Sequence, residues 1–175
     1  MALVVEDGTA KSNAESFCTV SFADSYHSNR GNSAWASIAT EAEKEALLRK
    51  ATDYMEEVYR LRWLGYRATE AQALSWPRDE VQRRDFTYLN QFSFYPNDQV
   101  PTEIQKACAE LALKANSESL APDIGRVKER SKVGPIDVTY EKGSPPYKRF
   151  RAVDNLLAPF LDSGSIGTFR NVVVG

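Results

Sequence analysis

The segment of residues 40–60 constrains the fold most, because apolar residues recur along it at the spacing of one helical face. Thr40 and Glu43 have the spacing of a capping box, in which two side chains satisfy the first free backbone N–H groups of a helix. Apolar residues then follow mostly at steps of three and four: Ala42, Ala46, Leu47, Ala51, Tyr54, Met55 and Val58. The pattern predicts a long amphipathic helix with one face covered by the rest of the chain.

Four other segments carry shorter helical patterns. Each combines apolar residues on one face with a start or stop signal such as Ser, Thr or Pro. The expected helices lie at 21–30 with Ser21 as N-cap, at 69–75 with Thr69 as N-cap, at 101–119 after Pro101, and at 151–161, where Pro159 kinks or ends the helix.

The pattern changes to strict alternation after the fourth of these helices. Residues 127–133 and 136–140 alternate between polar and apolar positions on either side of Gly134-Pro135. Two alternating runs around such a break predict a β-hairpin or bent ribbon over about 127–140. Residues 78–99, in contrast, read as an irregular loop, charged at first and then aromatic.

Together these patterns predict a mainly α fold: a small helical bundle with a short β-hairpin or ribbon and extended N- and C-terminal arms. Residues 1–161 form the expected helical domain, and residues 162–175 form a flexible C-terminal arm rich in Gly and Ser at its start. With 175 residues, the chain is long enough to bury a core without disulfides or metals.

Composition excludes several classes of function. The formal net charge of -2 argues against a general nucleic-acid binder. Cys18 and Cys108 lie far apart and form no CxxC pair, so we expect free, buried thiols in a reducing cytosol rather than a zinc cluster. The chain shows neither a signal-peptide pattern nor an apolar run long enough to span a membrane. We expect a soluble protein made in the cytoplasm, with no membrane partner.

His27 is the single histidine, which excludes two-histidine zinc sites and any catalytic triad that does not include it. It could act as a general base near Asp24, or it could be a surface or interface histidine. The second interpretation is favoured, because no nucleophile accompanies it. Ser165 lies in a Ser-Gly-Ser-Ile-Gly run that lacks the first glycine of a nucleophile elbow. The sequence therefore predicts no catalytic, cofactor-binding or metal-binding residues, and not an enzyme.

A basic strand is the first candidate binding feature. Residues 126–151 contain eight basic residues against three acidic ones. Lys128, Arg130 and Lys132 alternate, so on a strand they project from one face. They could face nucleic acid or an acidic partner, or they could be the lysine-protected edge of a solvated strand. The two interpretations are equally supported.

An aromatic cluster is the second candidate. Its members are Phe86, Tyr88, Phe92, Phe94 and Tyr95. They could stack on the bases of single-stranded DNA, or they could pack within a subunit or against a neighbour. Packing is favoured, because Arg83 and Arg84 precede the cluster and no basic residue lies inside it.

The C-terminal arm is the third candidate, because a Gly/Ser hinge leads into an apolar tip. The candidate docking residues are Ile166, Phe169, Arg170, Val172, Val173 and Val174. An exposed apolar strand aggregates, whereas one that adds to another subunit or inserts into a partner's groove is stable. The alternative is a tail that folds back on its own core.

Several segments resemble a known family. They are residues 2–9 (ALVVEDGT), 51–54 (ATDY), 73–78 (ALSWPR), 100–107 (VPTEIQKA) and 132–140 (KVGPIDVTY). Over residues 2–161 the chain is similar to small tailed-phage proteins labelled DnaT-like single-stranded-DNA-binding proteins, whose members resemble head–tail connector adaptors. These motifs are structural rather than catalytic. Residues 83–95 are longer and more aromatic than the family pattern.

The resemblance implies a structural head–tail connector, a ring below the portal that surrounds the DNA channel of a tailed phage. The implied partners are other copies of the chain (a dodecamer by family resemblance), the portal protein, the next neck or tail-completion protein, and genomic DNA that passes without specific binding. The implied location is the neck of the virion. The alternative is a single-stranded-DNA-binding replication accessory protein that uses the basic strand and the aromatic cluster.

Overall fold

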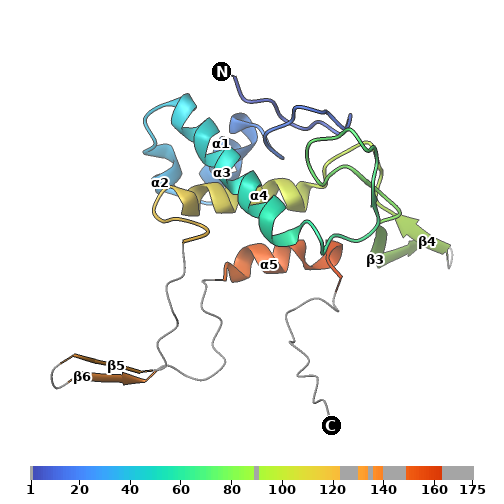
Figure 1. Cartoon of the computed structure of the whole chain (residues 1–175). Coiled ribbons are helices and arrows are strands. Elements are labelled where there is room, and N and C mark those ends of the chain that lie inside the picture. The colour runs from blue at the N-terminus through green and yellow to red at the C-terminus, as the bar shows by residue number, and fades with distance from the viewer. Residues whose placement is uncertain (1, 89–90, 123–129, 134–135, 140–148, 163–175) are drawn as a thin grey trace, which may run out of the picture.

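The computed structural model describes residues 2–88, 91–122, 130–133, 136–139 and 149–162 (Figure 1). Within them the fold is mainly α, a small helical bundle with short β elements, as the sequence predicts. The helices are α1 (Val20–Ser28), α2 (Ser33–Ala36), α3 (Glu41–Tyr59), α4 (Thr102–Ala115), α5 (Arg151–Leu157) and the 3-10 helix η1 (Ala158–Phe160). The strands form three antiparallel pairs: β1 (Tyr66–Arg67) with β2 (Arg78–Asp79), β3 (Gln82–Tyr88) with β4 (Gln91–Phe94), and β5 (Arg130–Val133) with β6 (Ile136–Thr139).

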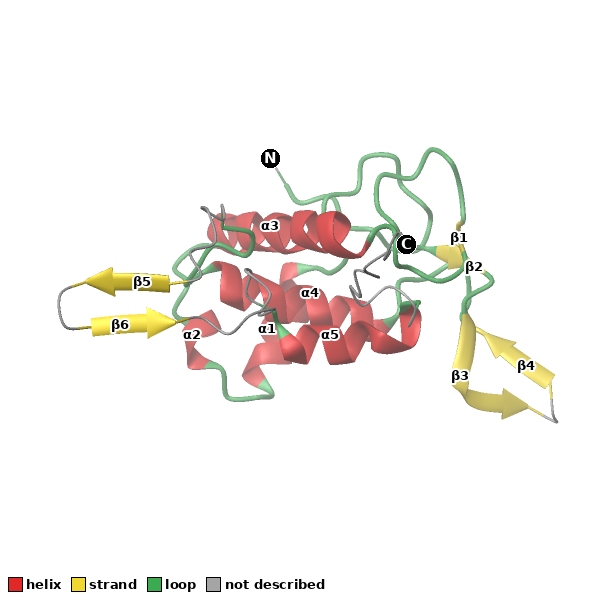
Figure 2. Ribbon diagram, turned by 60° about the horizontal axis from the view of Figure 1, so that its bottom comes forward, coloured by secondary structure: helices red, strands yellow, loops and turns green. Residues whose placement is uncertain are grey.

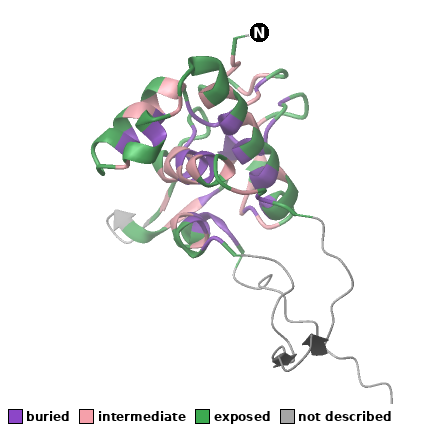
Figure 3. Cartoon of the chain, turned by 90° about the vertical axis from the view of Figure 1, so that its left-hand side faces the viewer, coloured by how far each residue is buried: buried purple, intermediate pink, exposed green. Residues whose placement is uncertain are grey.

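The centre of the bundle is the packing of α3 against α4, with α5 covering α4 (Figures 1 and 3). Leu48 and Met55 of α3, and Ile104 and Leu111 of α4, are fully buried. Burying each such side chain contributes roughly 1.5–3 kcal/mol relative to leaving it in water, so this contact dominates the stability of the fold.

The capping box at the start of α3 is confirmed. The Thr40 hydroxyl oxygen accepts from the Glu43 N–H at 3.2 Å, and the Glu43 carboxylate accepts from the Thr40 N–H at 3.1 Å. The predicted apolar stripe is correct only in part, because three of its members are exposed: Ala42, Ala46 and Val58. The buried face instead includes Leu48 and Tyr59, since the line of contact is set by where the neighbouring helices lie across α3.

The first helix begins one residue earlier than predicted. Thr19, and not Ser21, is the N-cap of α1, because its hydroxyl accepts from the Phe22 N–H at 3.0 Å. The short helix α2, which the sequence analysis did not predict, places Trp35 in the core beside His27, with ring centroids 4.9 Å apart.

The predicted helix over 69–75 is wrong, although its start signal is present. Thr69 and Gln72 form the reciprocal pair of a capping box, with backbone-to-side-chain distances of 2.8 and 3.2 Å. The chain then turns instead of continuing, because the buried Gln72 amide donates to the carbonyls of Leu74 and Pro77. The carbonyls of this loop are thus satisfied by side chains rather than by a helix.

Arg78 holds the other side of the same loop. Its guanidinium is buried and donates to the carbonyls of Leu64 at 2.7 Å, Gly65 at 2.7 Å and Ser75 at 3.2 Å. Burial, with a smaller contribution from the nearby Arg67, lowers the pKa of Arg78. Next to Arg78, Trp76 packs edge-on against Trp63 and Phe160.

Residues 78–99 also differ from the prediction. They contain the β3–β4 hairpin rather than an irregular loop, with a register shift between Gln82 and Thr87. Residues 85–88 (DFTY) and 91–94 (QFSF) alternate between polar and apolar residues, a hairpin signal that the polar run Gln82–Asp85 at the start of β3 obscured. Figure 2 shows the hairpin extending away from the helices.

The predicted ribbon is confirmed in a narrower form. Strands β5 and β6 pair in antiparallel register from Arg130 opposite Thr139 to Val133 opposite Ile136. Helix α4 ends at Ala115 rather than 119, and α5 passes into η1 at Ala158, next to Pro159, as a kinking proline predicts.

The extended N-terminal segment lies along the body. The Leu3 N–H donates to the Glu45 carboxylate at 3.1 Å, and the Glu6 N–H donates to the Ser16 carbonyl at 2.9 Å. Residues 163–175, the predicted C-terminal arm, lie outside the described part of the chain.

Candidate functional site

The β3–β4 hairpin, here named the aromatic hairpin, carries three exposed phenylalanines. Phe86 is 49% exposed, Phe92 is 74% exposed and Phe94 is 51% exposed. Large aromatic side chains of soluble proteins are usually found inside, so three on one projecting hairpin make it a candidate interaction surface. The predicted aromatic cluster is thus mostly a solvent-exposed surface in the single chain.

Tyr95 differs from the other members of the cluster. It lies just after β4, half-buried, with its ring centroid 4.8 Å from that of Phe160. The guanidinium of Arg83 lies 4.8 Å from the Tyr95 ring centroid. Burial raises the pKa of Tyr95. Tyr95 therefore anchors the aromatic hairpin to η1. The side chain of Tyr88 lies outside the described part of the structure.

The basic strand is described through its backbone. Arg130 and Lys132 are two residues apart in β5. Their partners in register are Thr139 and Asp137. Lys128 and the arm residues Ile166, Phe169, Arg170, Val172, Val173 and Val174 lie outside the described residues.

His27 is neither a surface histidine nor placed as a general base, so the favoured interpretation was wrong about its exposure. The side chain is fully buried. Its Nε2 lies 3.0 Å from the Ala109 carbonyl and its Nδ1 lies 3.0 Å from the Asn32 amide, which assigns a neutral ring that donates through Nε2. Desolvation lowers the pKa of His27. Asp24 is engaged by Trp35 Nε1 at 2.7 Å and by Lys44 Nζ at 2.8 Å.

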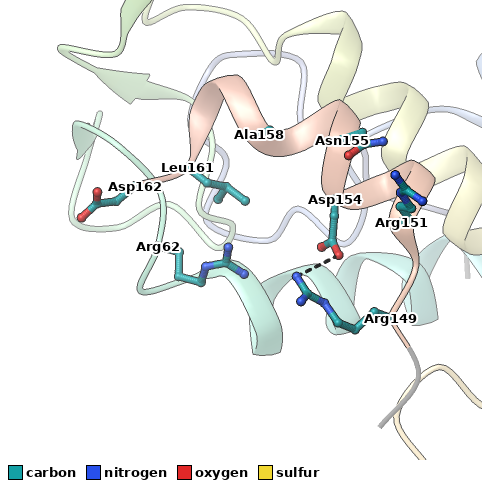
Figure 4. Close-up of a pocket in the computed structure, with 8 residues that line it drawn as sticks. All are labelled: Arg62, Arg149, Arg151, Asp154, Asn155, Ala158, Leu161 and Asp162. Atoms are coloured by element: carbon teal, nitrogen blue, oxygen red, sulfur yellow. Dashed lines mark ion pairs between the residues drawn. The ribbon is translucent and has the colours of Figure 1, made fainter. Parts of the chain in front are cut away.

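A cleft with three arginines lies beside α5 and is here named the arginine cleft. It has a volume of about 450 Å³. Its lining residues are Arg62, Arg149, Arg151, Asp154, Asn155, Ala158, Leu161 and Asp162 (Figure 4). Arg62 comes from the loop after α3, whereas Arg149 and Arg151 come from the start of α5. The sequence analysis placed Arg149 and Arg151 in a basic segment but missed Arg62, since no local pattern joins residues so far apart in sequence.

The carboxylate of Asp154 contacts side chains on two sides of the arginine cleft. Its Oδ1 accepts from the Tyr59 hydroxyl at 2.7 Å, and its Oδ2 lies 3.5 Å from Arg149 Nη2. Burial and this carboxylate raise the pKa of Tyr59 far above its ordinary value. The Tyr59 hydroxyl therefore stays protonated at neutral pH and donates a hydrogen bond to Asp154.

Among the residues that the structure describes, no group of three or more His, Cys, Asp or Glu side chains is placed to hold a metal ion. Likewise, no helix in the described ranges has both the length and the apolar character needed to cross a membrane. The thiols of Cys18 and Cys108 are free and buried, as predicted.

These features define a mainly helical domain with a projecting aromatic hairpin and an arginine-lined cleft. The chain belongs to the family described as "Putative DnaT-like ssDNA binding protein", whose model matches residues 1–174. The resemblance noted in the sequence is confirmed to that extent. A search of curated proteins and a search of solved structures each gave no significant match.

Proposed function

We propose that the chain is a structural head–tail connector of a tailed phage, a subunit of a ring that lies under the portal, surrounds the DNA channel and joins head to tail. The observation that carries this proposal is the aromatic hairpin, with Phe86, Phe92 and Phe94 exposed. Full burial of one Phe contributes roughly 1.5–3 kcal/mol, so covering the exposed parts of all three contributes on the order of 3–5 kcal/mol per subunit. Association with a neighbour supplies that burial.

A ring uses the same contact between every pair of neighbours, so one hairpin per subunit docks into one surface of the next. The basic strand of Arg130 and Lys132 would face the channel, while the net charge of -2 keeps passing DNA from being gripped. Residues 166–174 would dock on the portal. This role involves no catalysis and no cofactor, and its partners are the portal, the next neck protein and other copies of the chain, in the neck of the virion.

The test is the mass of the purified protein at physiological salt, with and without a portal ring from the same source. We expect a discrete ring-sized mass that forms with portal. The double variant Phe92→Ser/Phe94→Ser should abolish that mass and leave the free energy of unfolding unchanged, because both side chains are exposed. Tyr66→Ser, which removes an aromatic residue 69% exposed outside the hairpin, is the control and should still assemble. A double variant that assembles as well as wild type would refute the role of the hairpin.

A second function, single-stranded-DNA binding, is favoured by the family description and by one feature of the fold. Strand β3 brings Arg83 and Arg84 onto the same hairpin as the exposed phenylalanines, although the linear sequence shows no basic residue inside the cluster. Aromatic rings that stack on bases beside cations on the backbone are the usual parts of a single-strand site.

Fluorescence anisotropy with labelled oligothymidylate tests this alternative. A single-strand site predicts binding that weakens steeply with salt, that Phe92→Ala weakens at every salt concentration, and that Arg84→Gln weakens with a shallower salt slope. Absence of binding at low salt, together with a portal-dependent ring, would eliminate it.

A further inference from the structure

Arg62 is the most unusual side chain of the arginine cleft. Its guanidinium lies 5.5 Å from the ring centroid of Tyr59, and its Nε is buried with no hydrogen-bond acceptor among the described residues. Buried N–H groups of arginine nearly always have an acceptor, because leaving one unsatisfied is costly. In Figure 4 the side chains of Arg62 and Arg149 approach the space beside Asp154 from two different elements.

The carboxylates of the cleft do not accept a hydrogen bond from Arg62 Nε. Asp154 is held by Tyr59 at 2.7 Å and pairs with Arg149 at 3.5 Å. The chain at Asp162 is fixed by its N–H, which donates to the Arg62 carbonyl at 2.9 Å. Arg151 is exposed and forms no ion pair with any residue that the structure describes. The cleft thus presents three guanidinium groups against two carboxylates.

We propose that the arginine cleft is a binding site for a phosphate group. A phosphate carries one to two negative charges on several oxygens and can accept from Arg62 and Arg149, whose side chains approach the same space in Figure 4, in the forked geometry that guanidinium groups favour. Asp154 supplies one negative charge beside these two cations, and its Oδ1 is occupied by the Tyr59 hydroxyl, so one positive charge is left for an anion. The phosphate takes the place of the acceptor that Arg62 Nε lacks.

The size and walls of the cleft indicate what carries the phosphate. A volume of about 450 Å³ exceeds that of a phosphate ion and falls in the range of sites for small organic ligands. Ala158 and Leu161 supply apolar walls beside the arginines. Either a phosphorylated small molecule, such as a nucleotide, or one phosphodiester of a nucleic-acid strand has this chemistry. The proposal does not depend on ring assembly.

Isothermal titration calorimetry on the full chain at low salt tests the site with three probes: inorganic phosphate, thymidine 5′-monophosphate, and a short oligothymidylate without terminal phosphates. We expect saturable binding of at least one probe. Arg62→Gln and Arg149→Gln should each weaken it about tenfold, the typical effect of losing a hydrogen bond to a charged group. Arg60→Gln is the matched control, because Arg60 is exposed, lies two residues before Arg62 and is absent from the cleft lining, and it should change affinity by less than about twofold.

The probes also distinguish the two sources. Tighter binding of the oligothymidylate than of the monophosphate supports a nucleic-acid backbone, whereas equal or tighter binding of the monophosphate supports a small phosphorylated ligand. The circular-dichroism spectrum of each variant verifies folding, and Arg149→Gln keeps the test valid if Arg62→Gln does not fold, because Arg149 is exposed. No saturable binding of any probe, or an equal loss in Arg60→Gln, would overturn the proposal.

Discussion

Replacing Glu6 by glutamine should weaken the hydrogen bonds that hold the N-terminal loop and so lower the stability of the protein. The Glu6 side chain is only 3% exposed, and its carboxylate accepts three backbone N–H groups. Oε1 accepts from Gly8 at 2.8 Å and from Ala10 at 2.9 Å, and Oε2 accepts from Lys11 at 2.8 Å. One buried carboxylate therefore fixes the loop that follows it.

The expected loss follows from these three contacts. In Glu6→Gln the amide oxygen keeps two acceptor positions without the charge, while the amide nitrogen faces the Lys11 N–H, so one hydrogen bond is lost and two donors face each other. Hydrogen bonds to charged groups contribute about 1.5–3 kcal/mol each, and an unsatisfied buried donor costs about 1–3 kcal/mol. We expect the free energy of unfolding to fall by about 2–4 kcal/mol, and the Tm to fall by roughly 5–15 °C for a chain of this length.

Urea unfolding followed by tryptophan fluorescence and circular dichroism measures this change. Asp7→Asn is the matched control, because Asp7 is exposed and its contacts with Thr9 and Lys11 lie at the surface. Its effect should be clearly smaller than that of Glu6→Gln. A Glu6→Gln protein within about 0.5 kcal/mol of wild type would refute the reasoning, since the buried carboxylate would then contribute no more than a neutral amide.

Two further predictions concern other parts of the fold. Gly8→Ala should lower the free energy of unfolding by about 2–4 kcal/mol in the same urea assay, because φ at Gly8 is +103° and an added Cβ would lie 1.9 Å from the Asp98 carbonyl oxygen. Gly31→Ala should lower it by only about 1 kcal/mol, because φ at Gly31 is +68° and no atom lies within 4 Å of an added Cβ. Equal losses in the two variants would contradict the clash. His27 binds a proton less readily in the folded chain, so its contribution to stability is complete above the unfolded pKa of about 6.5 and is lost as pH falls below it. Urea midpoints between pH 7.5 and 5.5 should therefore fall more steeply for wild type than for His27→Gln, and parallel curves would contradict the burial of a neutral ring.

Local patterns in the sequence were sufficient for the elements whose hydrogen bonds close within a few residues. The capping box of Thr40 and Glu43, the long helix after it and the antiparallel ribbon near Gly134 all follow rules that act over one turn or one hairpin. The mainly α fold class followed from the same signals.

Two of the segments that carry the family resemblance hold irregular parts of the chain in place through buried charged side chains. Residues 2–9 contain the Glu6 carboxylate that holds three N–H groups, and residues 73–78 contain the Arg78 guanidinium that holds three carbonyls. Neither role is visible in a pattern of hydrophobicity, because a charged residue reads as exposed until its buried partners are known. The N-cap signal at Thr69 likewise predicted a helix that does not form, because the buried Gln72 amide satisfies the carbonyls of Leu74 and Pro77 instead.

For the candidate sites too, the sequence located individual residues but not which of them lie together. The sequence located the exposed phenylalanines of the aromatic hairpin, but not that they share a hairpin with Arg83 and Arg84. It placed Arg149 and Arg151 in a basic segment, but not beside Arg62. Composition also marked His27 as the single histidine, yet its burial depends on α2, which brings Trp35 against it.

By itself, then, the sequence determined α1, α3, α4 and α5, the ribbon and the types of residue available for binding, because propensity, capping and periodicity act between near neighbours. The tertiary structure decided which charges are buried and which lie together, since those depend on contacts between segments far apart in the chain. Arg62 and Arg149 show the difference: they are distant in sequence and line one cleft only because α5 packs beside the end of α3.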